Sequence, residues 1–249
     1  MAKRAESIAA TPAIALTKAS WSATKVIRLA AAALLVLAMR LFATAQAPDC
    51  VPGKLSDYTK LGAQGCVIGD KKFSNFRYHQ APDGLPSALI SVTPGTVPDS
   101  DDPALLFEAA WVAPSYQGSF VSYTVEVQPK GKPISGATLE MQFGQITGTG
   151  EARVVAEICP FADTADNCGA GELKLTVVLN PSQARKVVDS GELQNPTREV
   201  RVTSPLSIAT GKNGTASLNG FMTVFRSGGT QSLAPVDRST ASSSGTVGQ

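Results

Sequence analysis

The chain has one histidine, His79, in 249 residues. Histidine is the usual general base near neutral pH and a common zinc ligand, so its scarcity bears on both catalysis and metal binding. A Ser-His-Asp triad would have to use His79, and the sequence has no Gly-x-Ser-x-Gly turn to supply the nucleophile. The four cysteines include no Cys-x-x-Cys pair, which argues against a zinc site. We therefore predict a protein without a bound metal or cofactor.

Catalysis by carboxylates is the enzymatic alternative that the composition leaves open. Two Asp or Glu residues suffice for glycoside hydrolysis, and the chain has 20 such residues. Their spacing marks no particular pair, and most of them fall on the polar side of alternating segments. A non-enzymatic protein is therefore the favoured interpretation, and a carboxylate-dependent hydrolase is the less favoured one.

The chain also lacks an apolar run of the roughly 20 residues that a membrane-spanning helix needs. The run over residues 29–39 is about half that length, follows a basic segment and precedes Ala45-Gln46-Ala47. A basic segment, a short apolar core and a small-residue cleavage motif are typical of a secretory signal. We predict that residues 1–47 are a signal peptide and that the protein is secreted. The alternative is an uncleaved membrane anchor over residues 26–45.

Excess positive charge is absent once that segment is set aside. Six of the 22 Lys and Arg residues but one of the 20 Asp and Glu residues precede Pro48, so the remainder has a net charge of −3. Domains that bind nucleic acid carry a basic patch or stripe, and the chain shows none. We predict no nucleic-acid partner.

All four cysteines follow the predicted signal, and pairing is the default in an exported protein. Four cysteines allow three connectivities. We favour Cys50–Cys66 and Cys159–Cys168, because the members of each pair are close in sequence and flank a turn-rich loop. A disulfide that closes a loop of this size stabilises the folded state by about 3 kcal/mol in the chain-entropy model.

What the sequence has in abundance is period-two alternation. From Val121 to Gln128 the odd positions are apolar and the even positions are mostly polar, and similar alternation recurs to Thr203. This pattern puts one face of a strand in a core and the other in water, as in an antiparallel sheet. We predict an all-β domain over residues 48–226, an antiparallel β-sandwich of the jelly-roll or immunoglobulin-like kind. The expected strands cover residues 72–78, 89–93, 105–111, 121–128, 139–143, 153–158, 172–179, 199–203 and 216–225.

Helices are scarce in this interpretation. We expect short helical pieces at residues 55–61 and 182–188, besides the signal helix. Residues 227–249 are rich in Ser, Gly and Thr and have no periodicity, so they cannot bury enough apolar surface to order themselves. We predict a disordered tail there.

Four aromatic residues, Trp111, Tyr116, Phe120 and Tyr123, gather in and beside one strand pair. Exposed rings stack on sugars, whereas buried rings fill a core, and core packing is the simpler interpretation. The binding alternative makes Trp111, Tyr116 and His79 the candidate ligand contacts.

An acidic loop lies between two prolines and holds Asp99, Asp101 and Asp102. Calcium binds flexible loops that offer several carboxylates. This loop lacks the central glycine and the distant glutamate of a standard calcium loop. A solvated acidic turn is the favoured interpretation, and a calcium site is the alternative.

Residues 50–94 and 205–218 carry a resemblance to known proteins. In the first, Cys50 and Cys66 bracket Leu55-Ser56-Asp57-Tyr58 and Leu61-Gly62, and Gly65-Cys66-Val67-Ile68-Gly69-Asp70-Lys71-Lys72-Phe73-Ser74-Asn75-Phe76 is followed by Ile90-Ser91-Val92-Thr93-Pro94. In the second, Pro205-Leu206-Ser207-Ile208 leads to Gly211-Lys212-Asn213-Gly214-Thr215-Ala216-Ser217-Leu218. Here the chain resembles a group of exported bacterial proteins that often carry a PEP-CTERM sorting tail. The resemblance implies an extracellular β-rich protein tied to the envelope or to an exopolysaccharide matrix, with no general catalytic residues. The chain departs from the group after Ala234, where a polar stretch replaces the Pro-Glu-Pro motif, the apolar span and the basic end.

The favoured function is therefore that of a secreted, non-enzymatic β-sandwich protein with a structural or matrix-interaction role. The alternative is a carbohydrate-binding module. The expected partners are extracellular polysaccharide or envelope components, and a membrane only if residues 26–45 stay attached.

Overall fold

A computed structural model describes residues 46–112, 116–160, 172–181 and 186–228. The predicted signal peptide, most of the predicted disordered tail and Cys168 lie outside the described residues. Within the described part of the chain, no helix has the length and apolar character needed to cross a membrane.

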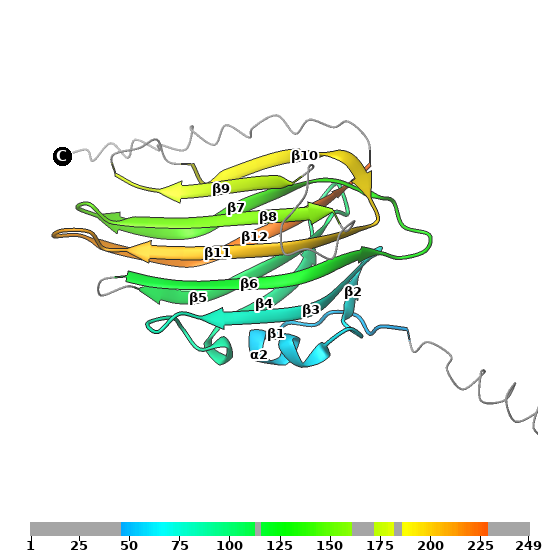
Figure 1. Cartoon of the computed structure of the whole chain (residues 1–249), viewed down its shortest axis with the longest axis horizontal. Helices are drawn as coiled ribbons and strands as arrows, with labels where there is room; N and C mark the ends of the chain where they lie inside the picture. The colour runs from blue at the N-terminus through cyan, green and yellow to red at the C-terminus, as the bar shows by residue number, and fades with distance from the viewer. Residues whose placement is uncertain (1–45, 113–115, 161–171, 182–185, 229–249) are drawn as a thin grey trace, which may run out of the picture. The chain divides into compact units, whose positions relative to one another are not determined.

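The described residues form two antiparallel sheets of six strands each, which confirms the predicted β-sandwich (Figure 1). We name them sheet A, with strand order β2-β3-β6-β11-β8-β9, and sheet B, with strand order β1-β4-β5-β12-β7-β10. The strands of sheet A are β2 (Cys66–Ile68), β3 (Lys71–Gln80), β6 (Tyr116–Val127), β8 (Glu151–Pro160), β9 (Leu173–Leu179) and β11 (Glu199–Ala209). Those of sheet B are β1 (Gly53–Lys54), β4 (Ser91–Thr96), β5 (Pro103–Val112), β7 (Ile134–Thr147), β10 (Val188–Thr197) and β12 (Thr215–Ser227).

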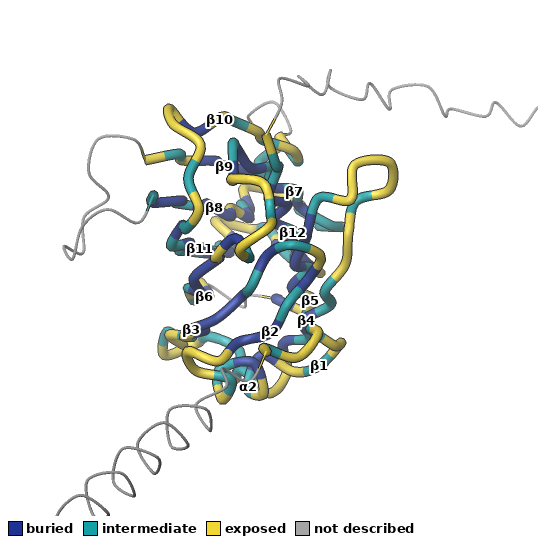
Figure 2. Tube along the Cα trace, turned by 90° about the vertical axis from the view of Figure 1, so that its right-hand side faces the viewer, coloured by how far each residue is buried: buried dark blue, intermediate teal, exposed yellow. Residues whose placement is uncertain are grey.

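Alternation in the sequence explains which face of each strand is buried. In β11 every second residue is buried, from Val200 to Ile208. The neighbouring strand β6 lies in register with it, so that Val200 opposes Val125 and Val202 opposes Tyr123. These apolar residues all point into the space between the sheets, while the polar residues between them point outward. Figure 2 shows the result, with buried stretches along the strands and exposed ones mainly at the connections.

Aromatic rings from both sheets meet in the centre of the core. Tyr123 of sheet A lies 6.0 Å from Phe107 and 6.3 Å from Phe225 of sheet B, measured between ring centroids. Phe73 of sheet A lies 5.8 Å from Phe225. Burial raises the pKa of the Tyr123 hydroxyl, because the phenolate would have no water around it. The aromatic cluster therefore joins the sheets through dry apolar contact.

A short helical segment closes one edge of the sandwich, as predicted for residues 55–61. It consists of α2 (Leu55–Tyr58) and η1 (Thr59–Leu61), and Leu55 and Tyr58 point into the core. Tyr58 donates a hydrogen bond to the carbonyl oxygen of Val51 at 2.7 Å, and burial raises its pKa to about 12. A further short turn, η2, spans Ser87–Leu89.

The structure describes both cysteines of one predicted disulfide but only one cysteine of the other. Cys50 and Cys66 are bonded, with their Cα atoms 4.8 Å apart, which confirms that pair. Cys159 is also disulfide-bonded, but its predicted partner lies outside the described residues.

One lysine is buried between the sheets. Lys71 on β3 is 0% exposed and pairs with the carboxylate of Asp70. Its ammonium group also donates to Ser227 Oγ at 2.7 Å and to the Lys132 carbonyl oxygen at 3.1 Å. The backbone N–H of Ser227 in turn donates to Asp102. This polar cluster links sheet A to the end of β12 in sheet B.

The predicted helix at residues 182–188 is wrong at its described end. Lys186 forms a β-bridge with Val178, and Val188 begins strand β10. The sequence prediction missed β10 altogether, because it is an edge strand in which Leu193 is the single fully buried apolar side chain. An edge strand at the end of a sheet is held by its ladder to β7 and does not need an alternating apolar face.

Candidate functional site

The outer face of sheet A carries side chains from four adjacent strands. The register places His79 of β3 opposite Phe120 of β6, and Phe120 opposite Pro205 of β11. One row further along, Gly118 opposes Ser207, and Ser207 opposes Arg153 of β8. Because residues in register point to the same face, all these side chains face away from the core.

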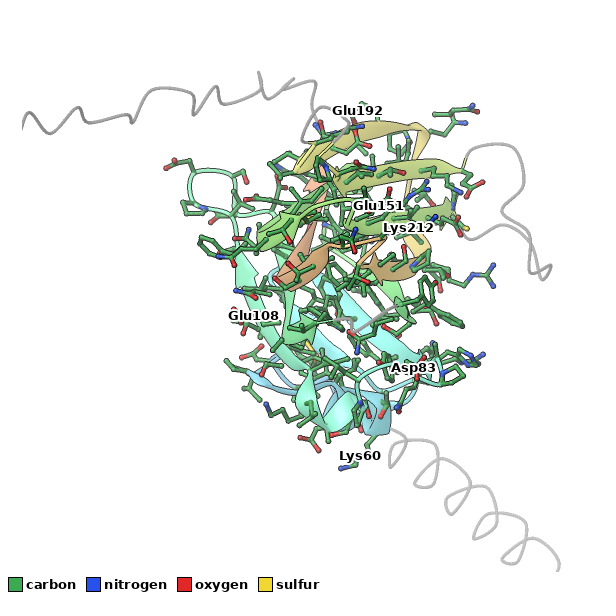
Figure 3. All side chains as sticks on the ribbon, turned by 90° about the vertical axis from the view of Figure 1, so that its left-hand side faces the viewer. Lys60, Asp83, Glu108, Glu151, Glu192 and Lys212 are labelled. Atoms are coloured by element: carbon green, nitrogen blue, oxygen red, sulfur yellow. A yellow bond between two sulfur atoms is a disulfide. The ribbon has the colours of Figure 1, made fainter. Side chains whose placement is uncertain are left out.

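These rows form a shallow hollow of about 410 Å³, which we call the sheet A hollow. Figure 3 views the end of the sandwich at which β8 begins, with Asp83, Glu151 and Lys212 labelled. The residues that line the hollow are His79, Ala81, Tyr116, Gly118, Ser119, Phe120, Arg153, Val155, Pro205, Leu206 and Ser207.

Aromatic rings form one side of the hollow. The rings of His79 and Phe120 stack with their centroids 5.0 Å apart and their planes at 19°. Tyr116 is 55% exposed and Phe120 is 37% exposed, so both offer ring surface to solvent. Flat, exposed rings with little rotamer freedom bury a large contact area when a ligand binds.

The absence of a side chain at Gly118 leaves room for the Tyr116 ring. A Cβ atom at Gly118 would lie 3.0 Å from the Tyr116 hydroxyl oxygen and 3.2 Å from a ring carbon. The tyrosine ring therefore lies down over the glycine, along the face of β6, instead of standing away from it. Any side chain at position 118 would push the ring out of this position.

Pro205 breaks a general rule of sheet construction at this point. Proline lacks an N–H group and is normally excluded from central strands, yet β11 lies between β6 and β8. The pairing of β11 with β8 reaches Thr203 and resumes at Leu206, so the proline lies at an interruption of the ladder. Its ring adds a rigid apolar surface beside Phe120 and Val155 in the hollow.

The loop after β3 closes one rim of the hollow. Ala81 donates its backbone N–H to the Gly118 carbonyl oxygen at 3.3 Å, and Gln117 donates to the Asp83 carbonyl oxygen at 3.0 Å. Gln80 bonds the Gly84 carbonyl oxygen at 2.8 Å. The rim is therefore tied to β6, the same strand that carries the two exposed rings.

The polar lining of the hollow is basic and hydroxylic. Arg153 and Ser207 contribute their side chains from β8 and β11, and His79 contributes its imidazole from β3. None of the described residues that line the hollow is Asp or Glu. The arrangement offers stacking surface and hydrogen-bond donors, but no pair of carboxylates for acid-base catalysis.

The structure places two of the three predicted ligand contacts in the sheet A hollow and the third in the core. His79 and Tyr116 both line the sheet A hollow. Trp111 does not, because it is 1% exposed and packs in the core with its ring 6.1 Å from Phe221. The indole points inward from β5 of sheet B, so including Trp111 among the ligand contacts was wrong.

The acidic loop does not assemble a calcium site in the described residues. No group of three or more metal-binding side chains is found there, and Asp102 accepts a hydrogen bond from Ser227. Asp99 and Asp101 both have positive φ, at 74° and 55°, as expected for Asp in tight turns. The three residues lie in the turn between β4 and β5, which favours the interpretation as a solvated acidic turn.

The sequence prediction missed Phe120, Arg153 and Pro205 as residues of the site. A signal for Phe120 was present, since it occupies an even-numbered position, as do Ser122 and Thr124 on the polar side of β6; we call this odd or even placement the parity of a residue. Tyr116 shares that parity, whereas Tyr123 has the opposite one and is buried. No comparable signal marks Arg153, because an arginine on the wet face of a strand is ordinary.

Comparison with known proteins adds little beyond the architecture. The sequence matches no protein-family profile and no curated protein. Among solved structures, the carbohydrate-binding module TmCBM61 in complex with β-1,4-galactotriose is 10% identical, with a TM-score of 0.24, over 62% of this chain and 86% of that one. The enzymatically active domain of bacteriophage CBA120 tailspike protein 4 is 13% identical, with a TM-score of 0.25, over 64% of this chain and 20% of that one.

A third solved structure, Trichoderma harzianum endoglucanase 3 from family GH12, is 10% identical, with a TM-score of 0.21, over 63% of this chain and 97% of that one. Likeness at this level supports no inference about function.

Proposed function

We propose that the protein is a secreted, non-enzymatic β-sandwich that binds an extracellular polysaccharide through the sheet A hollow. This binding would give it the matrix or envelope role that the sequence favours. The observation that carries the proposal is the placement of two exposed aromatic rings, Tyr116 and Phe120, beside Pro205 on a face whose other side chains are mostly polar. Single exposed apolar residues are common on protein surfaces, but several that gather on adjacent strands form a patch of the kind that ligands bind.

The geometry suits a sugar ring better than a fully apolar ligand. A pyranose has an apolar face of C–H groups that stacks on aromatic rings, and hydroxyl groups around its edge that need hydrogen-bond partners. The hollow offers Tyr116 and Phe120 for the first and the side chains of Arg153 and Ser207 for the second. Its shallow form, open to solvent, fits a chain that lies across the sheet.

A binding role without hydrolysis agrees with the lining of the hollow. Glycoside hydrolysis needs two carboxyl groups at the scissile bond, and the described lining residues supply none. Incubation of the purified protein with each polysaccharide that it binds should release no new reducing ends. Release of oligosaccharides by the protein would contradict the non-enzymatic part of the proposal.

Affinity gel electrophoresis against a broad panel of soluble polysaccharides tests the binding itself. We expect retardation by at least one polysaccharide, and a loss of affinity of about tenfold or more on Tyr116→Ala, since a buried aromatic contact contributes about 1.4 kcal/mol or more. Gly118→Ala should weaken binding less than Tyr116→Ala does, because the new methyl group only shifts the Tyr116 ring.

Phe143→Ala is the matched control for these variants. Phe143 is 77% exposed but lies on β7 of sheet B, so its loss should leave retardation unchanged. The proposal is wrong if no polysaccharide retards the protein, or if Tyr116→Ala and Phe120→Ala bind as tightly as the original chain.

A further inference from the structure

We infer that the sheet A hollow selects a polysaccharide that carries carboxylate groups, such as a uronic-acid polymer. This inference rests on the proposed glycan binding and adds the chemical class of the ligand. It starts from the charge that faces the hollow. The Arg153 guanidinium reaches it from β8, and no described lining residue carries a negative charge.

Three carboxylates on the same face as the hollow have partners. Glu157 of β8 forms an ion pair with Lys174 at 2.7 Å. Glu151, two residues before Arg153, accepts a hydrogen bond from Asn180 at 2.9 Å. Glu126 lies further along the face and pairs with Lys72 at 3.3 Å. These three carboxylates are thus occupied by cations or amides of neighbouring strands, whereas Glu199 lies opposite Glu126 at the far end of the face.

Two arginines of the face, Arg153 and Arg77, are in the opposite situation. Arg153 is exposed, and among the described residues it forms no ion pair. Arg77 is also exposed, lies one row beyond His79 on β3, and likewise has no described ionic partner. The face therefore holds two guanidinium groups whose charge is not balanced within the described part of the protein.

The placement of Arg153 fits recognition of a group on a sugar that stacks on the rings. Arg153 opposes Ser207, and Ser207 opposes Gly118, over which the Tyr116 ring lies. Arg153 is thus two strand spacings, about 10 Å, from the backbone beneath that ring. A planar guanidinium matches a carboxylate with two parallel hydrogen bonds, which a neutral hydroxymethyl group cannot accept.

Pairs of polysaccharides that differ only in charge distinguish recognition of a carboxylate from glycan binding in general. The probes are polygalacturonate, alginate and hyaluronate, each beside its methyl-esterified form, which keeps the backbone and removes the charge. Neutral glucans and galactans and a sulfated dextran complete the set. We expect the full-length protein to bind at least one uronate polymer, and to bind the esterified form about tenfold more weakly.

Two charge-removing variants complete the design. Arg153→Gln should lower the affinity for the uronate polymer about tenfold and leave affinity for the esterified form nearly unchanged. Lys130→Gln is the control, because Lys130 is an exposed cation in the turn after β6, at the end of that strand opposite to Tyr116. It should bind as the original chain does, which excludes diffuse attraction to a polyanion.

Each alternative result has a definite meaning. Equal affinity for charged and esterified polymers, or for a neutral glycan, with no effect of Arg153→Gln, overturns this inference and leaves the proposed function standing. Preference for the sulfated dextran over every uronate polymer also overturns it. Absence of binding to all of the polysaccharides overturns both.

Discussion

The outer faces of the two sheets differ, although their inner faces are built alike. Both inner faces alternate apolar residues into a shared aromatic core. On the outside, a row of sheet B runs through Thr93, Leu106, Met222 and Glu140. The corresponding surface of sheet A instead gathers the aromatic and basic side chains of the hollow.

This difference shows where the sequence is free of packing constraints. A residue on an inner face must fill space between the sheets, so its identity is explained by the core. A residue on an outer face meets water, and most polar residues would serve there equally well. The gathering of aromatic rings on sheet A is what the proposed ligand binding would explain, whereas the outer row of sheet B mixes polar and apolar residues without such a cluster.

Phe143 is the exception on sheet B, and it differs from the rings of sheet A in its backbone. It has a positive φ of 40° and lies where β7 faces the irregular stretch of β12 between Leu218 and Gly220. The irregularity lets Met141 and Ile146 both point toward the interior despite their odd spacing. Phe143 thus has a left-handed backbone next to the bulge between β5 and β12, while Tyr116 and Phe120 stand in regular register.

The largest expected effect distinguishes an inward from an outward aromatic residue. Trp111→Ala should lower the free energy of unfolding by about 3–5 kcal/mol, because it removes a fully buried indole and leaves a cavity. Tyr116→Ala should change it by less than about 0.5 kcal/mol, since its ring is exposed. Urea unfolding followed by circular dichroism measures both. Comparable losses for the two variants would contradict the assignment of Tyr116 to a surface site.

Two adjacent lysines give the next comparison, because they point to opposite faces of β3. Lys71→Gln should lower the free energy of unfolding by about 3 kcal/mol, since it leaves Asp70 and Ser227 without their buried partner. Lys72→Gln loses an ion pair with Glu126 at the surface and should cost less than about 1 kcal/mol. The same unfolding measurement applies, and equal effects would show that the buried cluster is not what joins the two sheets.

The period-two pattern predicted the sandwich because burial of one strand face is a local property of the sequence. The parity of Val200 and Val202 correctly assigned them to the core, as did that of Tyr123. Parity could also have placed Phe120 on the wet face, had it been applied to each aromatic residue separately. The favoured interpretation of Trp111 as a core residue is confirmed, and only the binding alternative, which grouped it by nearness in sequence with rings of the other sheet, included it among the ligand contacts.

The assembly of the site could not be predicted in the same way. His79, Phe120, Pro205 and Arg153 come from four strands, and only the strand order β3-β6-β11-β8 makes them neighbours. That order depends on which strands cross between the sheets, and no local pattern encodes it. The burial of Lys71 is hidden for the same reason, because its partner Ser227 is distant in the chain.

A glycine substitution tests the contrast between the bulge of sheet B and the regular strand of sheet A. Phe143→Gly should raise the free energy of unfolding by about 0.5 kcal/mol, since relief of the left-handed backbone exceeds the entropy that glycine loses. Phe120→Gly should lower it by about 1 kcal/mol, because Phe120 lies in regular extended backbone. Thermal unfolding of the two variants side by side decides the matter. Destabilisation by Phe143→Gly would mean that this ring makes contacts that its exposure does not reveal.

The smallest effect separates the two ends of the sheet A surface. Away from the hollow, Glu199 opposes Glu126, and burial together with the Glu126 carboxylate raises the pKa of Glu199. A raised pKa in the folded state means that the stability linked to this group is present at acidic pH and is lost as the pH rises through that pKa. Glu199→Gln should therefore stabilise the protein at neutral pH, by less than about 0.5 kcal/mol because solvent screens the repulsion.

The gain from Glu199→Gln should vanish below about pH 4, where the glutamate is protonated in both states. Glu157→Gln is the control of opposite sign, because at neutral pH it loses the ion pair with Lys174. Unfolding in urea at a series of pH values measures both. A destabilising effect of Glu199→Gln at neutral pH would mean that Lys72, which lowers the pKa of Glu199, outweighs the repulsion. The acidic end of this face would then be balanced in charge, and only the hollow would carry charge without a partner.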